Sequence, residues 1–272
     1  MKHLDRLNHS SQKYEDVRLT LLYDSMAHVR GLKTGWGFSC LVEVGETTLL
    51  FDTGGDGNIL LSNMKKLGVN PKAVQIVLLS HNRAGHIGGL AEFLQINPQV
   101  SVYIPESFPK RIIESIEKSG IEPMHAAHFH EIKPSLFTLG TFTGFFREQA
   151  LAINSSMGTI LVTGCAHHGV IPILQKAKEA LPGKPIYLAL GGFHFYGLSD
   201  SEKLIVFEAF KMLKVQKVAP CHCCEEACRL RFKKVYGHNY IEMGVGKVIR
   251  IDSTDELIKN NKQGVYHDGF GH

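Results

Sequence analysis

Short apolar segments alternate with longer amphipathic ones along the chain, and this pattern predicts both strands and helices. Residues 76–79 are continuously apolar, as expected for a strand buried on both faces of its sheet. Residues 58–66 instead place Ile59, Leu60 and Met64 near helical spacing. The other predicted strands are 17–22, 38–44, 47–51, 100–104, 136–146, 150–154, 159–163, 186–190, 217–219 and 247–251. The other predicted helices are 88–95, 109–118, 170–180, 201–213 and 225–232.

The order of these elements favours a layered α/β architecture. Strand-rich halves are each followed by helices, without the regular βαβ alternation of a doubly wound sheet, so two sheets covered by helices fit better. A chain of 272 residues with 44% hydrophobic residues can bury a large core. We therefore expect a single domain over residues 1–272, with a loose polar tail from about Asp252.

Charge and hydropathy restrict the classes of partner. The net charge is +4, from 30 basic and 26 acidic residues, which creates no strong field for nucleic acid or a membrane surface. A small-molecule substrate, including one that carries phosphate, remains as the expected partner. No run of about 18 apolar residues occurs, and residues 1–17 lack a signal-like apolar stretch, so a cytoplasmic protein is expected. The oligomeric state stays open.

Six cysteines are present, and four of them are crowded together at Cys221, Cys223, Cys224 and Cys228. This is not the dispersed pattern of a secreted disulfide framework, so reduced thiols or metal ligands are indicated. Cys221 and Cys224 form one Cys-x-x-Cys pair, but no second pair accompanies it. Buried thiols are therefore favoured over a separate soft-metal or redox site. His125, His128 and His130 lie in a loop-like stretch and are expected to face solvent.

Histidines follow the buried strand at 76–79 in a pattern that suits a metal site. The segment reads Ser-His-Asn-Arg-Ala-Gly-His-Ile-Gly-Gly, with His81 at the strand end and His86 near a helix start. Imidazole ligands suit zinc or a similar divalent ion, and an open coordination position can activate water. Arg83 is a very poor ligand because it is permanently protonated, and Gly85 has no side chain.

This segment resembles the His-x-His-x-Asp-His loop of the metallo-β-lactamase superfamily, with Arg83 at the second histidine and Gly85 at the aspartate. Further segments resemble the dihydropteroate-synthase-like branch of that superfamily, in the expected order. They are Phe-Asp-Thr-Gly at 51–54, Thr-Gly-Cys-Ala-His at 163–167, Gly-Gly-Phe-His at 191–194, Pro-Cys-His-Cys at 220–223, and residues 236–246. The resemblance spans residues 17–251 and implies a four-layer αββα metallo-β-lactamase sandwich.

The resemblance also implies a site that binds zinc or another divalent metal ion, one or two per chain. Its metal ligands would be His81, His86, His167 and His222, with Cys165 as a weaker candidate. Asp52, Arg83 and His194 would act in catalysis. Asp52 orients a ligand in this interpretation, although it could instead cap its own turn at residues 53–55. The absent histidine and aspartate weaken both metal centres, and Arg83 either turns outward or binds an anionic group of the substrate.

Three functions follow from these residues. The first is a metal-dependent hydrolase that acts on a small substrate, for example a phosphorylated one, through metal-activated water. The alternative is a degenerate homologue that binds a ligand or a single metal without efficient hydrolysis, as the two altered loop positions suggest. A thiol-based role of the cysteines at 221–228 ranks last.

Overall fold

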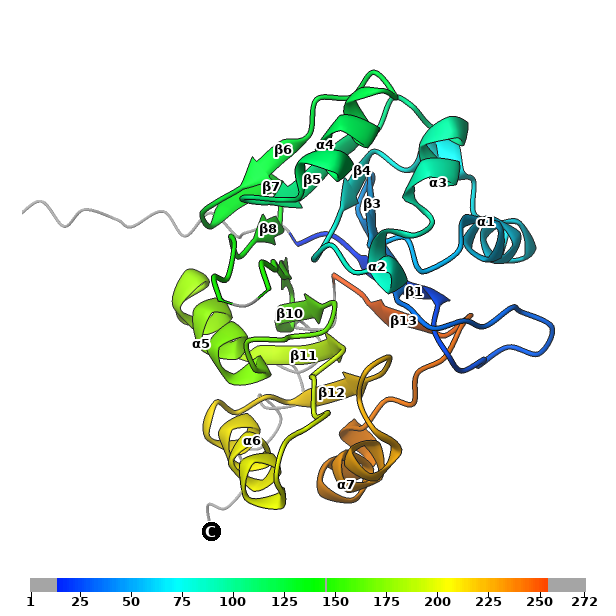
Figure 1. Cartoon of the computed structure of the whole chain (residues 1–272). Helices are drawn as coiled ribbons and strands as arrows, with labels where there is room; N and C mark the ends of the chain where they lie inside the picture. The colour runs from blue at the N-terminus through cyan, green and yellow to red at the C-terminus, as the bar shows by residue number, and fades with distance from the viewer. Residues whose placement is uncertain (1–13, 145, 254–272) are drawn as a thin grey trace, which may run out of the picture.

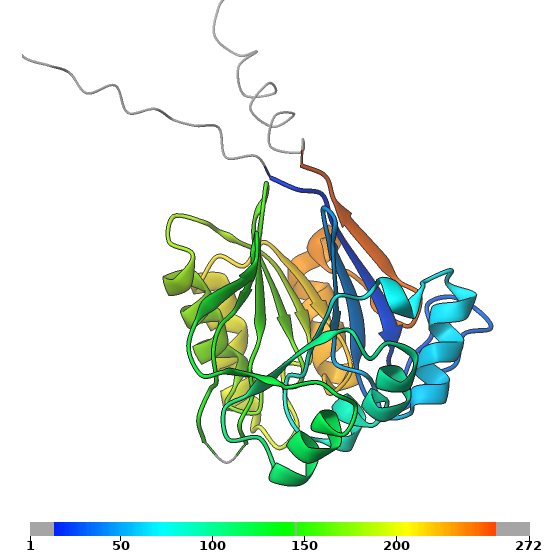
Figure 2. The ribbon, with the colours of Figure 1, turned by 90° about the horizontal axis from the view of Figure 1, so that it is seen from above.

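The computed structural model describes residues 14–144 and 146–253, which form two sheets packed face to face with helices on their outer surfaces (Figures 1 and 2). The strands are β1 (Val17–Tyr23), β2 (Ser39–Val44), β3 (Thr47–Phe51), β4 (Ile76–Leu78), β5 (Ser101–Pro105), β6 (Met124–Ala126), β7 (His130–Lys133), β8 (Leu136–Thr138), β9 (Leu151–Ser155), β10 (Gly158–Thr163), β11 (Ile186–Gly191), β12 (Lys217–Pro220) and β13 (Val248–Ile251). The helices are α1 (Gly57–Lys66), α2 (Ala84–Ile87), α3 (Leu90–Ile96), α4 (Lys110–Glu117), α5 (Val170–Ala180), α6 (Asp200–Met212) and α7 (Glu226–Tyr236), with 3-10 turns η1 (Pro71–Ala73) and η2 (Gly237–Asn239).

The two sheets have mixed topology. The first runs in the order β13-β1-β2-β3-β4-β5-β6, and the second in the order β12-β11-β10-β9-β8-β7. Strands β3 to β6 are parallel to one another, as are β10 to β12, whereas the remaining pairs are antiparallel. In a parallel set the carboxyl ends of neighbouring strands lie at one edge of the sheet, where the following loops can build a site.

Three hydrophobic cores correspond to the three contacts between the four layers. One core fills the space between the sheets, and the other two lie between each sheet and its covering helices. Strand alternation explains how one strand serves two cores: in β3, Leu49 and Phe51 face the other sheet, while Leu50 faces the helices. Strand β10 is buried along its whole length because both faces are covered.

Local sequence signals account for the outer helices. Helix α6 begins with a capping box in which Ser199 and Glu202 satisfy each other's backbone amides. Helix α7 contributes Phe232, whose ring packs against Phe207 and Phe210 at centroid distances of 4.6 and 5.1 Å. Burial of these aromatic side chains anchors both helices on the second sheet.

The predicted elements occur in the structure with small shifts of their ends, and two predictions were wrong. The predicted strand 136–146 ends at Thr138, because Gly140 takes a positive φ of 78° and its backbone packs directly against His128. His125 and His130 lie in the edge strands β6 and β7 rather than in a loop, although both side chains are exposed as expected. The predicted loose tail falls almost entirely outside the described residues, as does most of the stretch 1–17.

Within residues 14–144 and 146–253, no helix is long and apolar enough to cross a membrane.

Candidate metal centre

The candidate site residues follow the carboxyl ends of strands from both sheets. In the first sheet Asp52 follows β3, and His81 follows β4 with His86 in the short helix α2. In the second sheet the positions are Cys165 and His167 after β10, His194 after β11, and His222 after β12. Because the sheets pack face to face, these loops meet across the interface between them (Figure 1).

Backbone strain is concentrated in the same loops. Among the described residues, Asp52, Ala166, His194 and His222 all have positive φ angles, of 58°, 62°, 43° and 52°. Such conformations are costly for residues other than glycine and persist only when the surroundings hold them in place. At His222 the buried carboxylate of Asp24 accepts a hydrogen bond from the backbone amide at 3.1 Å. The packing and hydrogen bonds around these loops therefore hold the four residues in backbone conformations that they would rarely adopt alone.

A buried network sets the orientation of His81 and His86. The Oδ2 atom of Asp52 lies 2.7 Å from Nδ1 of His86 and accepts a hydrogen bond from Ser80 Oγ at 2.6 Å, while Oδ1 accepts the Ser80 amide. Because Ser80 donates to Asp52, its oxygen accepts from Nδ1 of His81 at 2.8 Å. When a ring carries one proton, we therefore assign that proton to Nδ1, which leaves a lone pair on Nε2. Asp52 thus contacts the ring of His86, and its predicted role in orienting a ligand stays a prediction.

Glu148 contacts Nδ1 of His167 as Asp52 contacts Nδ1 of His86, and the sequence did not identify this residue. Its buried carboxylate lies 3.2 Å from Nδ1 of His167 and accepts the amide of His168 at 3.0 Å. Burial alone would raise the pKa of Glu148, but these hydrogen bonds hold it below its usual value, so the carboxylate is charged. The one sequence signal was a glutamate a few residues before the apolar strand β9, which is a weak indication by itself.

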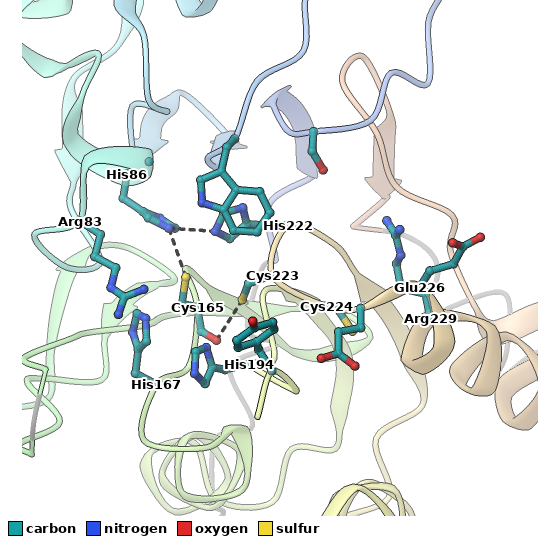
Figure 3. A pocket seen from close by; sticks show the side chains of 15 residues that line it. Arg83, His86, Cys165, His167, His194, His222, Cys223, Cys224, Glu226 and Arg229 are labelled. Carbon is teal, nitrogen blue, oxygen red and sulfur yellow. Dashed lines mark hydrogen bonds between the residues drawn. The ribbon is translucent and has the colours of Figure 1, made fainter. Parts of the chain in front are cut away.

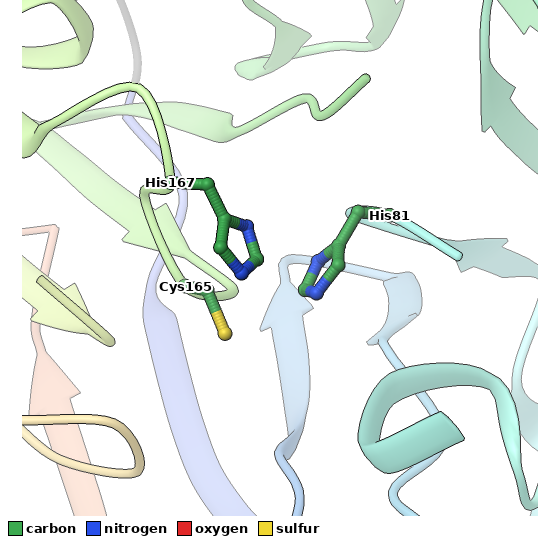
Figure 4. A group of neighbouring side chains, drawn as sticks. All are labelled: His81, Cys165 and His167. Atoms are coloured by element: carbon green, nitrogen blue, oxygen red, sulfur yellow. The ribbon is translucent and has the colours of Figure 1, made fainter. Parts of the chain in front are cut away.

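Two groups of potential ligand atoms result, and both contain Cys165. His86, Cys165 and His222 form one group, with Nε2 of His86 lying 3.1 Å from Nε2 of His222 and 3.2 Å from the Cys165 sulfur (Figure 3). His81, Cys165 and His167 form the other (Figure 4). Within each group the ligand atoms all lie within 4.8 Å of one another.

The donor set fits a divalent metal ion. Nε2 of His81 and Nε2 of His167 are buried and have no hydrogen-bond partner, which is costly unless something binds them. Burial lowers the pKa of His81 well below its ordinary value, and it lowers the pKa of His222 to about 3. Both rings are therefore neutral at neutral pH, which is the form that binds metal.

Gly164 lies directly against the Ser80 and Asp52 side chains of the first sheet, and this contact positions Cys165. A Cβ at this residue would collide with Ser80 Oγ and would lie 3.1 Å from Oδ2 of Asp52. Only glycine allows the loop after β10 to lie directly on the Asp52 network. This contact between sheets places the Cys165 sulfur among the imidazoles of the first sheet.

The two altered loop positions have different surroundings. The guanidinium of Arg83 lies 4.3 Å above the ring of Phe146 and lines the same pocket as His86 and His167 (Figure 3). It therefore faces the pocket, although the side chain is also exposed to solvent. Gly85 packs against the backbone of Gly37, and its carbonyl accepts the Phe38 amide at 3.0 Å.

A pocket of about 460 Å³ opens above the ligand groups. Trp36, from the glycine-containing stretch before β2, lines the pocket while remaining 68% exposed, and its ring lies 4.9 Å from that of His222. His194 also lines it, with its ring 4.7 Å from that of His167 and with Nδ1 unpartnered. The structure thus brings His194 beside the ligand candidates.

The cysteine-rich segment does not form a separate metal group among the described residues. The side chains of Cys221, Cys224 and Cys228 are buried as free thiols, the first between the sheets and the other two under helices. Cys223 is less deeply buried and lines the pocket, which Cys224 also reaches. A hydrogen bond with Cys223, together with burial, raises the pKa of Cys165, and the same contact lowers the pKa of Cys223. Buried thiols, which the sequence favoured over a soft-metal cluster in this segment, are found at Cys221, Cys224 and Cys228.

Comparison with known proteins agrees with the fold and the loop arrangement. The model of the metallo-beta-lactamase superfamily matches residues 37–180, more than half of the chain, which therefore belongs to this superfamily. A relative from Methanocaldococcus jannaschii, 7,8-dihydropterin-6-methyl-4-(beta-D-ribofuranosyl)-aminobenzene-5'-phosphate synthase, is 26% identical over 88% of this chain and 98% of its own length. The predicted four-layer αββα sandwich and the family resemblance are both confirmed.

Solved structures show the same architecture. The crystal structure of Tm1679, described as a metal-dependent hydrolase of the beta-lactamase superfamily, has a TM-score of 0.72 and 25% identity, with 87% of this chain and 99% of that chain covered. YhfI from Bacillus subtilis, a metallo-beta-lactamase fold protein, has a TM-score of 0.60 and 17% identity over 87% of this chain and 100% of its own, and shows the fold alone.

Proposed function

We propose that this chain is a metal-dependent hydrolase that acts on a small anionic substrate in the pocket above Cys165. One observation carries the proposal: the lone pairs of four buried or nearly buried imidazoles converge with one thiol at the pocket floor. Zinc or a similar divalent ion bound there would supply a water of lowered pKa and polarise the bond to be cleaved.

The chain's own residues would divide the remaining work. Asp52 and Glu148 hold their histidines in one tautomer and orientation, which raises the basicity of Nε2. Arg83 would bind an anionic group of the substrate, since its permanent charge faces the pocket. His194, with an unpartnered Nδ1 at the pocket wall, is placed to give a proton to the leaving group.

The relatives support a small, phosphorylated substrate. The name of the Methanocaldococcus jannaschii relative describes a synthase whose product carries a 5'-phosphate. The description of Tm1679 is that of a metal-dependent hydrolase. Cationic residues at the pocket, here Arg83 and Arg229, and a metal centre are the features that a phosphate group would require.

The test combines metal analysis with a panel of substrates. Protein purified without chelators is assayed for metal per chain and for hydrolysis of a phosphate monoester, a phosphodiester and a lactone. Activity should disappear with a chelator and with His167→Ala, return when zinc is added to the wild type, and persist in the exposed control His130→Ala. Turnover that survives metal removal contradicts the proposal, while bound metal without turnover of any substrate leaves the binding-only alternative.

Arg83→Gln separates binding from chemistry. Loss of one charge-assisted hydrogen bond, worth about 1.5–3 kcal/mol, should raise KM for the phosphate substrates by roughly tenfold to a hundredfold. The KM for a neutral lactone should change little, as should all constants in the exposed control Arg111→Gln on α4. An equal effect on charged and neutral substrates would assign Arg83 a structural role instead.

A further inference from the structure

We propose that Asp24 is a positioning residue of the candidate metal centre, which holds the backbone of His222 where its imidazole meets that of His86. The Asp24 carboxyl group acts through His222 and does not itself bind the metal. It should therefore affect the ligand group that contains His222 and leave the group around His81 unchanged. This proposal rests on the proposed function, because it concerns the same metal site, but it is tested by metal binding and without measuring hydrolysis.

His222 is held differently from the other candidate ligands. Each of the other three imidazoles has a side-chain partner at Nδ1, namely Ser80 for His81, Asp52 for His86 and Glu148 for His167. Nδ1 of His222 has no side-chain partner in the part of the chain that the structure describes. Its ring lies beside the backbone of Gly37, at centroid distances of 4.9 Å from Trp36 and 6.4 Å from Phe38. These contacts restrain the ring, but none of them holds the backbone that carries it.

The backbone of His222 depends on Asp24 for a hydrogen bond across the two sheets. With a φ of 52°, His222 adopts a conformation that is costly for a residue other than glycine. Its buried amide donates to Oδ2 of Asp24 at 3.1 Å, although the two residues are 198 positions apart. The neighbouring amides of Cys221 and Cys224 donate to the carbonyls of Gly191 and Cys221, within the second sheet and its loop. Asp24 therefore connects this strained turn to the first sheet.

Asp24 is itself fixed at the end of β1, with only 1% of its surface exposed. Its Oδ1 atom accepts hydrogen bonds from the Met26 amide at 3.0 Å and from the Ser25 hydroxyl at 3.2 Å. Its backbone carbonyl accepts the Gly35 amide at 3.0 Å. A buried carboxyl group is costly unless its oxygens are bound, and here both of them are. Because Oδ1 is bound on its own side, Oδ2 is presented to His222 in one direction.

Loss of this contact should move a ligand. Nε2 of His222 lies 3.1 Å from Nε2 of His86, and a metal site accepts errors of only about 0.2 Å in its ligand distances. Without an acceptor at Oδ2, the turn at His222 can relax toward an ordinary φ, which carries the imidazole away from His86. The loops that carry His81 and His167 receive no hydrogen bond from Asp24 among the described residues, so their ligand group should keep its geometry.

A double-mutant cycle tests whether Asp24 acts through His222. The metal-free, reduced protein is titrated calorimetrically with Zn²⁺ in two backgrounds: His81→Ala leaves the ligand group that contains His222, and His222→Ala leaves the other group. Asp24→Ala should weaken zinc binding about tenfold or more in the first background. It should change zinc binding by less than about twofold in the second, because a residue that acts through His222 has nothing left to position there.

Three further variants separate positioning from general stability. Asp24→Ser keeps an acceptor for the Met26 amide but is too short to reach His222, so it should fold readily and show the same selective loss. Ser25→Ala removes a donor to Oδ1 and leaves Oδ2 free for His222, so its zinc affinity should match the wild type. Ile116→Ala, in the core beneath α4, should lower the free energy of unfolding without changing zinc affinity. Urea unfolding of each metal-free variant measures the stability.

An equal loss of zinc affinity in the two backgrounds would give Asp24 a general structural role and overturn the proposal. Unchanged affinity in the His81→Ala background would overturn it as well, as would the absence of zinc binding in either background, since the two ligand groups would then not be separate. Metal-dependent hydrolysis together with an equal loss leaves the proposed function standing without this inference. A loss confined to the His81→Ala background, in a protein that hydrolyses none of the substrates, does the reverse.

Discussion

The Nε2 atoms of His86 and His222 lie 3.1 Å apart, although the two residues are separated by 136 positions in the chain. His86 belongs to a helix beside the first sheet, and His222 follows the last strand of the second. Their approach shows that the candidate metal centre is a product of the packing of the two sheets. Residues that hold the loops in place should therefore affect metal binding without contacting the metal.

Asp52 is the first such residue. Asp52→Asn places an amide where three donors converge, from Ser80 N, Ser80 Oγ and His86 Nδ1, so at least one pair of donors must oppose each other. We expect metal affinity to fall about 10- to 100-fold, and the free energy of unfolding to decrease by about 1–3 kcal/mol. Asp56→Asn is the matched control, because asparagine also caps a helix at this exposed position. Calorimetric zinc titration and urea unfolding measure both effects, and unchanged zinc affinity would contradict the orienting role.

Glu148 gives a prediction in acid. Its pKa in the folded protein lies below the ordinary value of 4.5, so the stability it contributes is present above pH 4.5 and is lost as the pH falls through its folded pKa. Glu148→Gln cannot titrate, and the unfolding free energy of this variant should depend less steeply on pH in that window. The variant should also bind metal more weakly, since His167 loses its carboxylate partner. If the unfolding free energies of the wild type and Glu148→Gln depend equally on pH in this window, Glu148 does not have this role.

Histidine burial predicts a second pH effect in the metal-free protein. Burial lowers the pKa of His222 to about 3 in the folded protein, compared with 6.5 in the unfolded chain. Between pH 6.5 and 3 the unfolded chain therefore binds a proton at His222 that the folded protein does not bind. Stability should therefore fall as the pH drops from 6.5 toward 3, and His81 acts in the same direction. Urea unfolding of His222→Asn should show a shallower pH dependence than wild type, while His125→Asn, an exposed control, should match wild type.

Restoring the family's loop residues should have unequal effects at the two positions. A Cβ at residue 85 would lie 3.2 Å from the Cα of Gly37 and 3.4 Å from the Trp36 carbonyl oxygen, so Gly85→Asp should cost about 1–3 kcal/mol through overpacking. Gly85→Ala, which adds the same Cβ without a carboxylate, should be similarly destabilised. Arg83→His introduces no additional Cβ and should increase bound metal at the ligand group of His81, Cys165 and His167. Thermal unfolding and metal analysis of the variants check this, and a fully stable Gly85→Ala would show that Gly37 can move.

Several features of the fold follow from local sequence. Continuous apolar runs such as 76–79 and 186–190 identify strands buried on both faces, because a sheet covered on two sides leaves no polar surface. The stretch 201–213 was likewise predicted as a helix, and it corresponds to α6. The strand predicted for 136–146 was too long because Gly140 turns the chain through contact with His128, a neighbour distant in sequence.

The candidate site likewise contains residues that the sequence could identify and residues that only the fold brings together. The loop at 81–86 and the motif histidines could be identified from sequence, because their spacing after strand ends is a local property. Glu148 could not be assigned, since its role depends on the position of His167, 19 residues further along and on a different strand end. Trp36 and Cys223 also reach the site only through the folding of their loops.

The sequence alone therefore determined the family and the layered α/β class, and it named the candidate histidines of the site and the two loop positions that lack the usual ligands. Only the tertiary structure decided that Cys165 stands between both groups of histidines and that Arg83 faces the pocket. The physical reason is that ligand geometry requires positions accurate to a fraction of an ångström. Such accuracy arises when two sheets pack against each other, with Gly164 allowing their loops to touch.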